Sequence, residues 1–91
     1  MAAINSDKPF YLAPGYRLQW EEAQQKDVIL YPEGMVELNP SSSAILKLCD
    51  GTRGLDTIVN ELEALFETSG LKSDIEEFLT IALDNGWIQQ N

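Results

Sequence analysis

The 91-residue sequence predicts an α+β domain, in which a three-stranded antiparallel sheet is followed by three α-helices. Two observations indicate this class. Before residue 39 the apolar residues recur at every second position, the period of a strand, and after it at intervals of three and four, the period of a helix. Short runs rich in proline, glycine, aspartate and asparagine separate the periodic segments. A chain of this length buries one hydrophobic core and not two.

The predicted organisation is a single domain over residues 16–91, preceded by an N-terminal arm over residues 1–15. The pair Pro14-Gly15 marks the boundary, because both residue types interrupt regular structure. Linkers between the expected elements are short. A monomer and a dimer that exchanges elements between two copies therefore remain alternatives.

The three strands are expected at residues 16–21, 28–31 and 35–38. The first alternates, which places Tyr16, Leu18 and Trp20 on one face. The second is β-branched and aromatic on both faces, as is typical of a central strand. Between the second and third, Tyr31-Pro32-Glu33-Gly34 has proline and glycine where a type I turn favours them. The sequence therefore predicts a meander.

The first helix is expected to start at Asn39-Pro40, an N-cap residue followed by the helix position that tolerates proline, and to end at Asp50-Gly51. The second, over residues 55–67, has a continuous apolar stripe that includes Leu65 and Phe66. For the third, Ser73 and Glu76 have the spacing of a capping box, and Gly86 is the expected stop.

The composition argues against most chemistries. A net charge of −9, with six basic residues and no histidine, repels phosphate backbones and anionic membranes. One cysteine, Cys49, supplies no metal-ligand set and is expected to be buried. We find no catalytic constellation and no cofactor motif, and we expect the acidic pairs to be solvated. No signal peptide or stretch of about 20 apolar residues is present, so a cytoplasmic location is the expectation.

The third strand indicates a function. Its outer edge is predicted to be unpaired and carries no lysine, so an extended peptide could add to it as a further strand. The apolar side of the third helix either forms a wall beside that edge or simply packs inward. The candidate peptide-binding residues on the two elements are Met35, Val36, Glu37, Leu38, Ile75, Phe78, Leu79, Ala82 and Leu83.

An ordered set of short segments resembles the PqqD family of pyrroloquinoline quinone biosynthesis. The segments span nearly the whole chain and are Pro14-Gly15-Tyr16-Arg17-Leu18-Gln19-Trp20-Glu21, Leu30-Tyr31-Pro32-Glu33-Gly34, Leu38-Asn39, Ile45-Leu46, Leu48-Cys49-Asp50-Gly51 and Gly86-Trp87-Ile88. One departure is Gly54, which stands where a threonine or serine cap for the second helix is expected.

The resemblance implies a non-catalytic peptide chaperone. Members of the family bind the ribosomally made precursor peptide PqqA and deliver it to the radical SAM enzyme PqqE, which cross-links a glutamate and a tyrosine within it. They typify the RiPP recognition element, a winged-helix-like domain in which the leader lies along strand three and against helix three. In this chain those elements are residues 35–38 and the apolar face from Ile75 to Leu83.

Two other classes of protein have similar composition or architecture. Acidic helical domains of this length include carrier proteins, but no Asp-Ser-Leu attachment sequence for a phosphopantetheine arm is present. The winged-helix plan also serves DNA binding or protein interaction, and the scattered basic residues argue against DNA.

Overall fold

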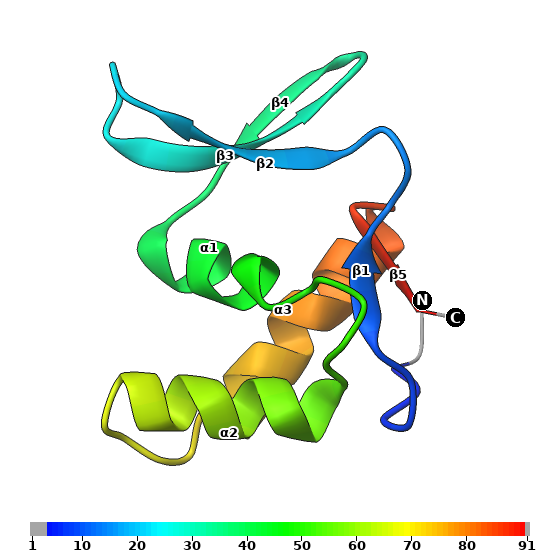
Figure 1. Cartoon of the computed structure of the whole chain (residues 1–91), viewed down its shortest axis with the longest axis vertical. Coiled ribbons are helices and arrows are strands. Elements are labelled where there is room, and N and C mark those ends of the chain that lie inside the picture. The colour runs from blue at the N-terminus through cyan, green and yellow to red at the C-terminus, as the bar shows by residue number, and fades with distance from the viewer. Residues whose placement is uncertain (1–3, 91) are drawn as a thin grey trace.

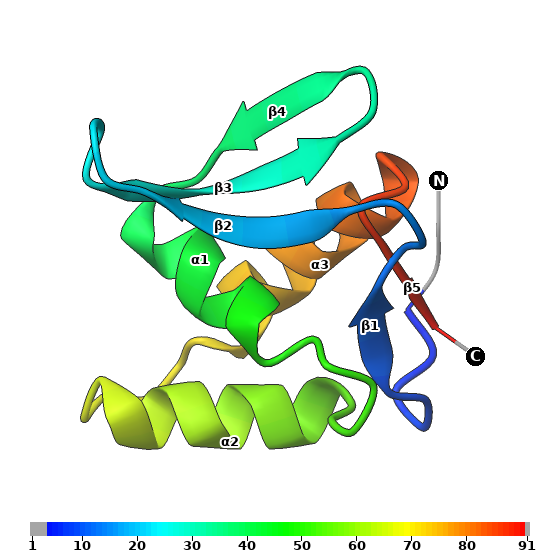
Figure 2. The same cartoon turned by 45° about the horizontal axis from the view of Figure 1, so that its top comes forward.

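The computed structural model describes residues 4–90 and confirms the α+β class, with three helices and antiparallel sheets (Figure 1). The elements in chain order are β1 (Phe10–Leu12), β2 (Arg17–Glu21), β3 (Lys26–Tyr31), β4 (Gly34–Glu37), α1 (Pro40–Lys47), α2 (Leu55–Leu65), α3 (Lys72–Asp84) and β5 (Ile88–Gln90). The three-stranded sheet lies over α1, with α2 on the opposite side of α1 (Figure 2). The winged-helix-like arrangement stays a prediction.

The sheet is the expected meander, with strands in the order β2-β3-β4 and both pairs antiparallel. Its central strand is the one with apolar residues on both faces. Val28 and Ile29 point to opposite faces and are both fully buried. Tyr31 pairs with Gly34, so Pro32 and Glu33 form the turn into β4. The local pattern thus determined both the strand order and the turn.

The expected N-terminal arm needs correction, because part of it belongs to the folded domain. β1 pairs antiparallel with β5 at the other end of the chain, and Phe10 lies opposite Gln90 with its side chain fully buried. The side-chain amide of Gln90 donates to the carbonyls of Asn5 at 2.6 Å and Lys8 at 2.9 Å. Residues 5–12 and 88–90 therefore lie together (Figure 1). Residues 1–3 of that arm, and Asn91, lie outside the described part of the chain.

The start of α1 is as predicted. Asn39 is the N-cap, and its side-chain oxygen accepts a hydrogen bond from the amide of Ser42 at 2.7 Å. Pro40 occupies the first turn, where its missing amide hydrogen costs nothing. The helix ends at Lys47, before the predicted Asp50-Gly51 stop.

The start of α3 is not as predicted. Ser73 and Glu76 form no capping box, because Leu71 is the N-cap and has no side-chain capping bond, and Ser73 is already inside the helix. A carboxylate from α2 takes over this role. Glu63 accepts a hydrogen bond from the backbone amide of Leu71 at 3.0 Å. A contact between two helices has replaced the local cap.

The start of α2 explains the glycine that departs from the family pattern. Gly54 is the N-cap and offers no side-chain hydrogen bond. A Cβ atom built on it would lie 3.3 Å from the carbonyl oxygen of Ser6 and 3.4 Å from that of Lys8. The N-terminal turn therefore occupies the space that a serine or threonine cap would need.

The core lies between the inner face of the sheet and the three helices, and it includes β1 and β5. Fourteen buried residues form it: Phe10, Ile29, Leu38, Ile45, Leu46, Cys49, Leu55, Ile58, Val59, Leu62, Ile75, Leu79, Ala82 and Ile88. The end of the stripe predicted for α2 is not part of it. Leu65 and Phe66 are 67% and 50% exposed, because the last turn of α2 extends past the core.

Candidate functional site

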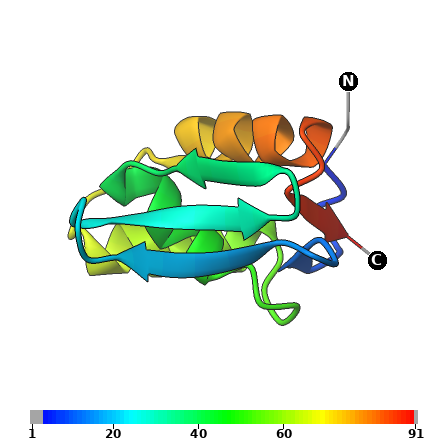
Figure 3. The ribbon, with the colours of Figure 1, turned by 90° about the horizontal axis from the view of Figure 1, so that it is seen from above.

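The outer edge of β4 offers unpaired backbone groups. No other strand borders this edge within residues 4–90. The amide of Leu38 donates to the carbonyl of Asp27 at 3.0 Å, so Leu38 turns its backbone groups toward β3. Backbone direction alternates along an antiparallel strand, so Val36 also faces β3, and the amides and carbonyls of Met35 and Glu37 point to the open side. Seen from above, α3 projects beyond this edge (Figure 3), and Figure 1 shows that it lies below the sheet.

The side chains of β4 divide by the same alternation. Leu38 is buried against the helices and Val36 is half-buried beside it. Met35, 45% exposed, and Glu37, whose side chain is 51% exposed, point to the outer face of the sheet. All four predicted residues of this strand therefore lie at the edge, but only two of them face the helices.

The predicted residues of α3 lie at different depths. Ile75, Leu79 and Ala82 are at most 3% exposed and belong to the core, where they support the surface from beneath. Phe78 and Leu83 are half-buried and pack against that core. The inward packing considered in the sequence therefore describes most of this stripe.

The sequence pattern missed the exposed shoulder of α3. Ile81 is 45% exposed, although it follows Phe78 by one helical turn. Asp74, Phe78, Ile81 and Asn85 are spaced i, i+4, i+7 and i+11, which places them on one face of the helix. That spacing was readable in the sequence. The stronger signal of the core stripe obscured it.

A small apolar pocket lies where β4 leads into α1. Its volume is about 210 Å³, and the polar residues Asn39, Ser41, Ser42 and Asp74 form part of its lining. The apolar side chains that line it are Ile45, Leu62, Phe66, Leu71, Ile75 and Phe78. Phe78 also contacts Trp87, with ring centroids 6.5 Å apart. We define the β4–α3 groove as the open edge of Met35 to Glu37, the shoulder formed by Asp74, Phe78 and Ile81, and this pocket.

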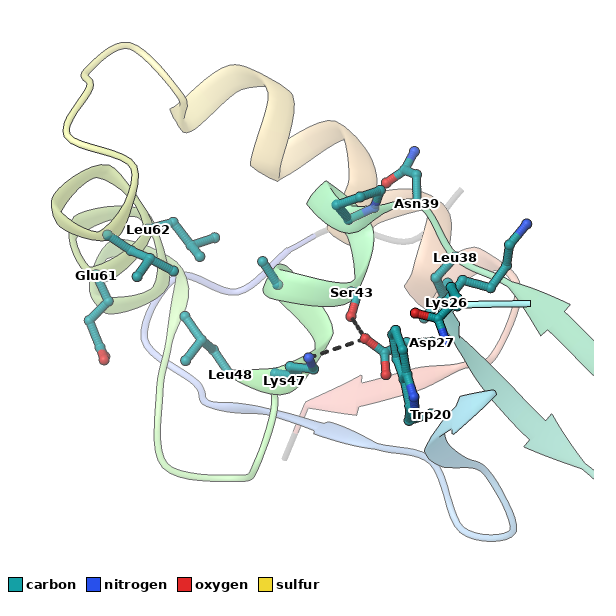
Figure 4. A pocket seen from close by; sticks show the side chains of 14 residues that line it. Trp20, Lys26, Asp27, Leu38, Asn39, Ser43, Lys47, Leu48, Glu61 and Leu62 are labelled. Atoms are coloured by element: carbon teal, nitrogen blue, oxygen red, sulfur yellow. Dashed lines mark hydrogen bonds and ion pairs between the residues drawn. The ribbon is translucent and has the colours of Figure 1, made fainter. Parts of the chain in front are cut away.

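A larger pocket, of about 950 Å³, lies on the other side of α1 (Figure 4). Trp20, half-exposed, stands at its mouth. Inside it, the carboxylate of Asp27 accepts a hydrogen bond from the Ser43 hydroxyl and pairs with Lys47 at 3.1 Å. The bond from Ser43 is the largest cause that lowers the pKa of Asp27, and Lys47 lowers this pKa further. The carboxylate therefore stays ionised, Lys47 balances its charge, and the two contacts connect α1 to the sheet.

Two observations concern the thiol and the possible metal ligands of the described residues. Burial raises the pKa of the Cys49 thiol to about 12, so the thiolate needed for nucleophilic attack does not form near neutral pH. Residues 4–90 contain no group of three or more histidine, cysteine, aspartate or glutamate side chains placed to hold a metal ion. Within the same residues, none of the helices has the length and apolar character that crossing a bilayer requires.

Comparison with known proteins gives consistent matches. Residues 28–88 match the family model described as coenzyme PQQ synthesis protein D (PqqD). The PqqA binding protein of Methylococcus capsulatus is 51% identical over 88 residues, which cover 97% of this chain and 95% of that protein. The PqqA binding protein of Klebsiella pneumoniae strain 342 is 52% identical over 75 residues, 81% of this chain and 82% of that protein.

Solved structures share the fold. The solution NMR structure of the PqqD truncation of Methylobacterium extorquens PqqCD, described as a functional and stand-alone RiPP recognition element, superposes with a TM-score of 0.79 at 26% identity. It covers 96% of this chain and 95% of that one. The heterocyclase TruD matches 92% of this chain with 12% of its own, at 17% identity and a TM-score of 0.70, which shows a common fold alone. With a family model covering residues 28–88 and relatives about half identical over most of their length, the chain belongs to the PqqD family of coenzyme PQQ synthesis.

Proposed function

We propose that this chain is a non-catalytic chaperone that binds the precursor peptide PqqA in the β4–α3 groove and presents it to the radical SAM enzyme PqqE. The single observation that carries the proposal is the open edge of β4, whose Met35 and Glu37 turn their backbone groups away from β3. Relatives that are 51% and 52% identical bear the name PqqA binding protein, which supports the choice of guest.

The mechanism is positional. A flexible peptide that pairs with β4 exchanges hydrogen bonds to water for bonds to Met35 and Glu37, and it buries apolar side chains against Val36, Phe78 and Ile81. Its conformations become restricted, and its effective concentration rises beside any enzyme that the chaperone also contacts. A chaperone of this kind needs no acid, base, metal or cofactor of its own.

Binding is tested by hydrogen exchange on ¹⁵N-labelled protein titrated with the precursor. The amides of Met35 and Glu37 should exchange with solvent in the free protein and become protected on binding, because each gains an acceptor. The amide of Val36 already faces β3 and serves as the internal control. Changes confined to α2, or unaltered exchange at Met35 and Glu37 in saturated protein, would reject strand addition.

Delivery to the enzyme needs its own measurement. PqqE should cross-link the precursor faster with this protein than without it. A Phe78→Glu variant should lose that gain, because a charge would enter the wall of the apolar pocket. Asp7→Asn, on the exposed N-terminal turn away from the groove, is the matched control. Equal rates with and without the wild-type protein would reject delivery while leaving peptide binding intact.

A further inference from the structure

A strand added to β4 would meet two different environments on alternate residues. The pleat continues from strand to strand, so one set of guest side chains lies beside Val36 and Leu38 and points toward the helices. The other set lies beside Met35 and Glu37 and points to the outer face of the sheet. Because the period is two, a guest that slips by one residue exchanges the two sets completely. The groove can therefore distinguish peptides by which side chains occupy alternate positions of their sequence.

The inward environment is apolar. Val36 on β4 is half-buried and Leu38, directly after it, is buried, while Phe78 on α3 is half-buried against the same core and Ile81 is exposed. The 210 Å³ pocket is lined by both Asn39, which follows the strand, and Phe78 of α3. Inward side chains of a guest would therefore gain most when they are aliphatic or aromatic.

The border of the groove is acidic. Glu33 precedes β4 and Glu37 is its last residue, while Asp74 and Glu77 are exposed on α3. Of these four, Glu37 alone has an ion-pair partner within residues 4–90, Lys26 at 3.3 Å. The nearest cation in sequence on α3, Lys72, instead pairs with Asp56 of α2 at 3.6 Å. Four carboxylates therefore share one lysine, in a chain whose net charge is −9.

We propose that the β4–α3 groove selects an extended peptide segment in which apolar residues alternate with lysine or arginine, with the apolar side chains inward and the cations on the outer side, near Glu37 and Glu33 of the β4 edge. The inference rests on the proposed peptide-binding function and adds to it the chemical class of the guest. Opposite charges on neighbouring strands attract, and like charges repel. The net charge steers a basic guest toward the protein and slows the approach of an acidic one.

Three labelled ten-residue peptides test the pattern: one alternates valine with lysine, one valine with serine and one valine with glutamate. Fluorescence anisotropy at low and high salt gives each Kd. The lysine peptide should bind most tightly and the glutamate peptide most weakly, and the difference should shrink as salt screens the charges. Each exposed ion pair is worth roughly a 1.5- to 5-fold change in affinity. Equal affinities, the reverse order, or no binding of the lysine peptide would overturn the proposal.

Variants of the protein locate the effect. A Glu33→Gln and Glu37→Gln double variant should weaken the lysine peptide about 2- to 25-fold, the product of two such pairs, and leave the serine peptide within about twofold. Asp7→Asn removes one charge away from the groove and should leave the lysine peptide within about twofold. If Asp7→Asn weakens the lysine peptide as much per charge as the double variant does, net charge and not the groove carries the preference, and the proposal fails.

The precursor separates this proposal from the function on which it rests. If the precursor protects the amides of Met35 and Glu37 while the three peptides bind equally, strand addition stands and the charge pattern is rejected. If the precursor leaves those amides unprotected, the proposed function itself is rejected.

Discussion

Ser43 on α1 donates its hydroxyl hydrogen to the carboxylate of Asp27 on β3. Ser43 is 5% exposed and the Asp27 side chain 12%, so water cannot easily replace either partner. Lys47, one turn further along α1, completes the contact at 3.1 Å. Through these three residues α1, the helix that follows β4, is fixed against the central strand.

Removing this carboxylate should therefore cost stability. We expect Asp27→Ala to lower the free energy of unfolding by about 1–3 kcal/mol, because the buried Ser43 hydroxyl loses its acceptor. Asp56→Ala is the matched control, since Asp56 also pairs with a lysine but is 73% exposed, and it should change stability by less than about 1 kcal/mol. Urea denaturation of both variants gives the comparison. Equal losses would contradict the structural role of Asp27.

The same contact predicts a response to acid. The folded protein lowers the pKa of Asp27 below its ordinary value of 3.8, chiefly through Ser43. A carboxyl with a depressed folded pKa contributes stability that is present above the unfolded pKa and is lost as pH falls through the folded pKa. The stability gap between wild type and Asp27→Asn should thus stay constant above about pH 5 and narrow below about pH 4. A stability difference between wild type and Asp27→Asn that does not change with pH would contradict the lowered pKa of Asp27.

The start of α3 offers a test of local against tertiary capping. Glu63→Ala removes the carboxylate that accepts from the Leu71 amide and should cost about 0.5–2 kcal/mol. Ser73→Ala should stay within about 0.5 kcal/mol of wild type, because Ser73 lies inside the helix and does not cap it. Thermal unfolding of the Glu63→Ala and Ser73→Ala variants measures both losses of stability. A larger loss for Ser73→Ala would favour the capping box that the sequence predicted.

Proline substitutions should distinguish the two sides of β4. Met35→Pro removes an amide that points to the open edge and should weaken peptide binding about 2- to 10-fold while the fold persists. Met35→Ala removes the side chain alone and is its control. Val36→Pro removes an amide of the β3 ladder and should lower the melting temperature instead. Calorimetry of binding and of unfolding separates the effects. Unchanged peptide affinity in folded Met35→Pro would exclude this edge.

The thiol should be protected in the native state. Cys49 is 3% exposed, and burial raises the pKa of its thiol to about 12. Native protein at pH 8 should react with a disulfide reagent far more slowly than protein unfolded in urea, where the thiol regains its ordinary pKa. Absorbance of the released leaving group measures both rates. Rapid reaction of the native protein would contradict the burial of Cys49.

Several features encoded within a few consecutive residues were predicted correctly, although the capping box at Ser73 and Glu76 was not. The central position of β3 follows from Val28 and Ile29 being apolar on opposite faces, and the start of α1 follows from Asn39 and Pro40. Features that join distant residues were not. β1 and β5 have three residues each and pair across most of the chain, so neither is long enough to display a period.

The sequence predicted the strand and the helix that form the candidate groove, but not which of their residues are exposed in it. The alternation of Met35 to Leu38 indicated an edge, but which backbone groups face outward depends on the bond between Leu38 and Asp27. On α3 the helical period marked Leu79 as strongly as Phe78, yet one is fully buried and the other lines a pocket. Depth along an apolar stripe depends on the neighbours that cover it.

The sequence by itself determined the class of fold, most of the strands and helices, and the family, because strand and helix periods, turns and caps depend on residues a few positions apart. Only the tertiary structure decided that β1 closes on β5, that Glu63 caps α3, and that Gly54 must make room for residues 6 to 8. Each of these is a contact between surfaces brought together by burial of the core. The hydrophobic effect depends on the apolar area that is buried and not on its position in the chain, so it brings together segments whose contact no local sequence pattern indicates.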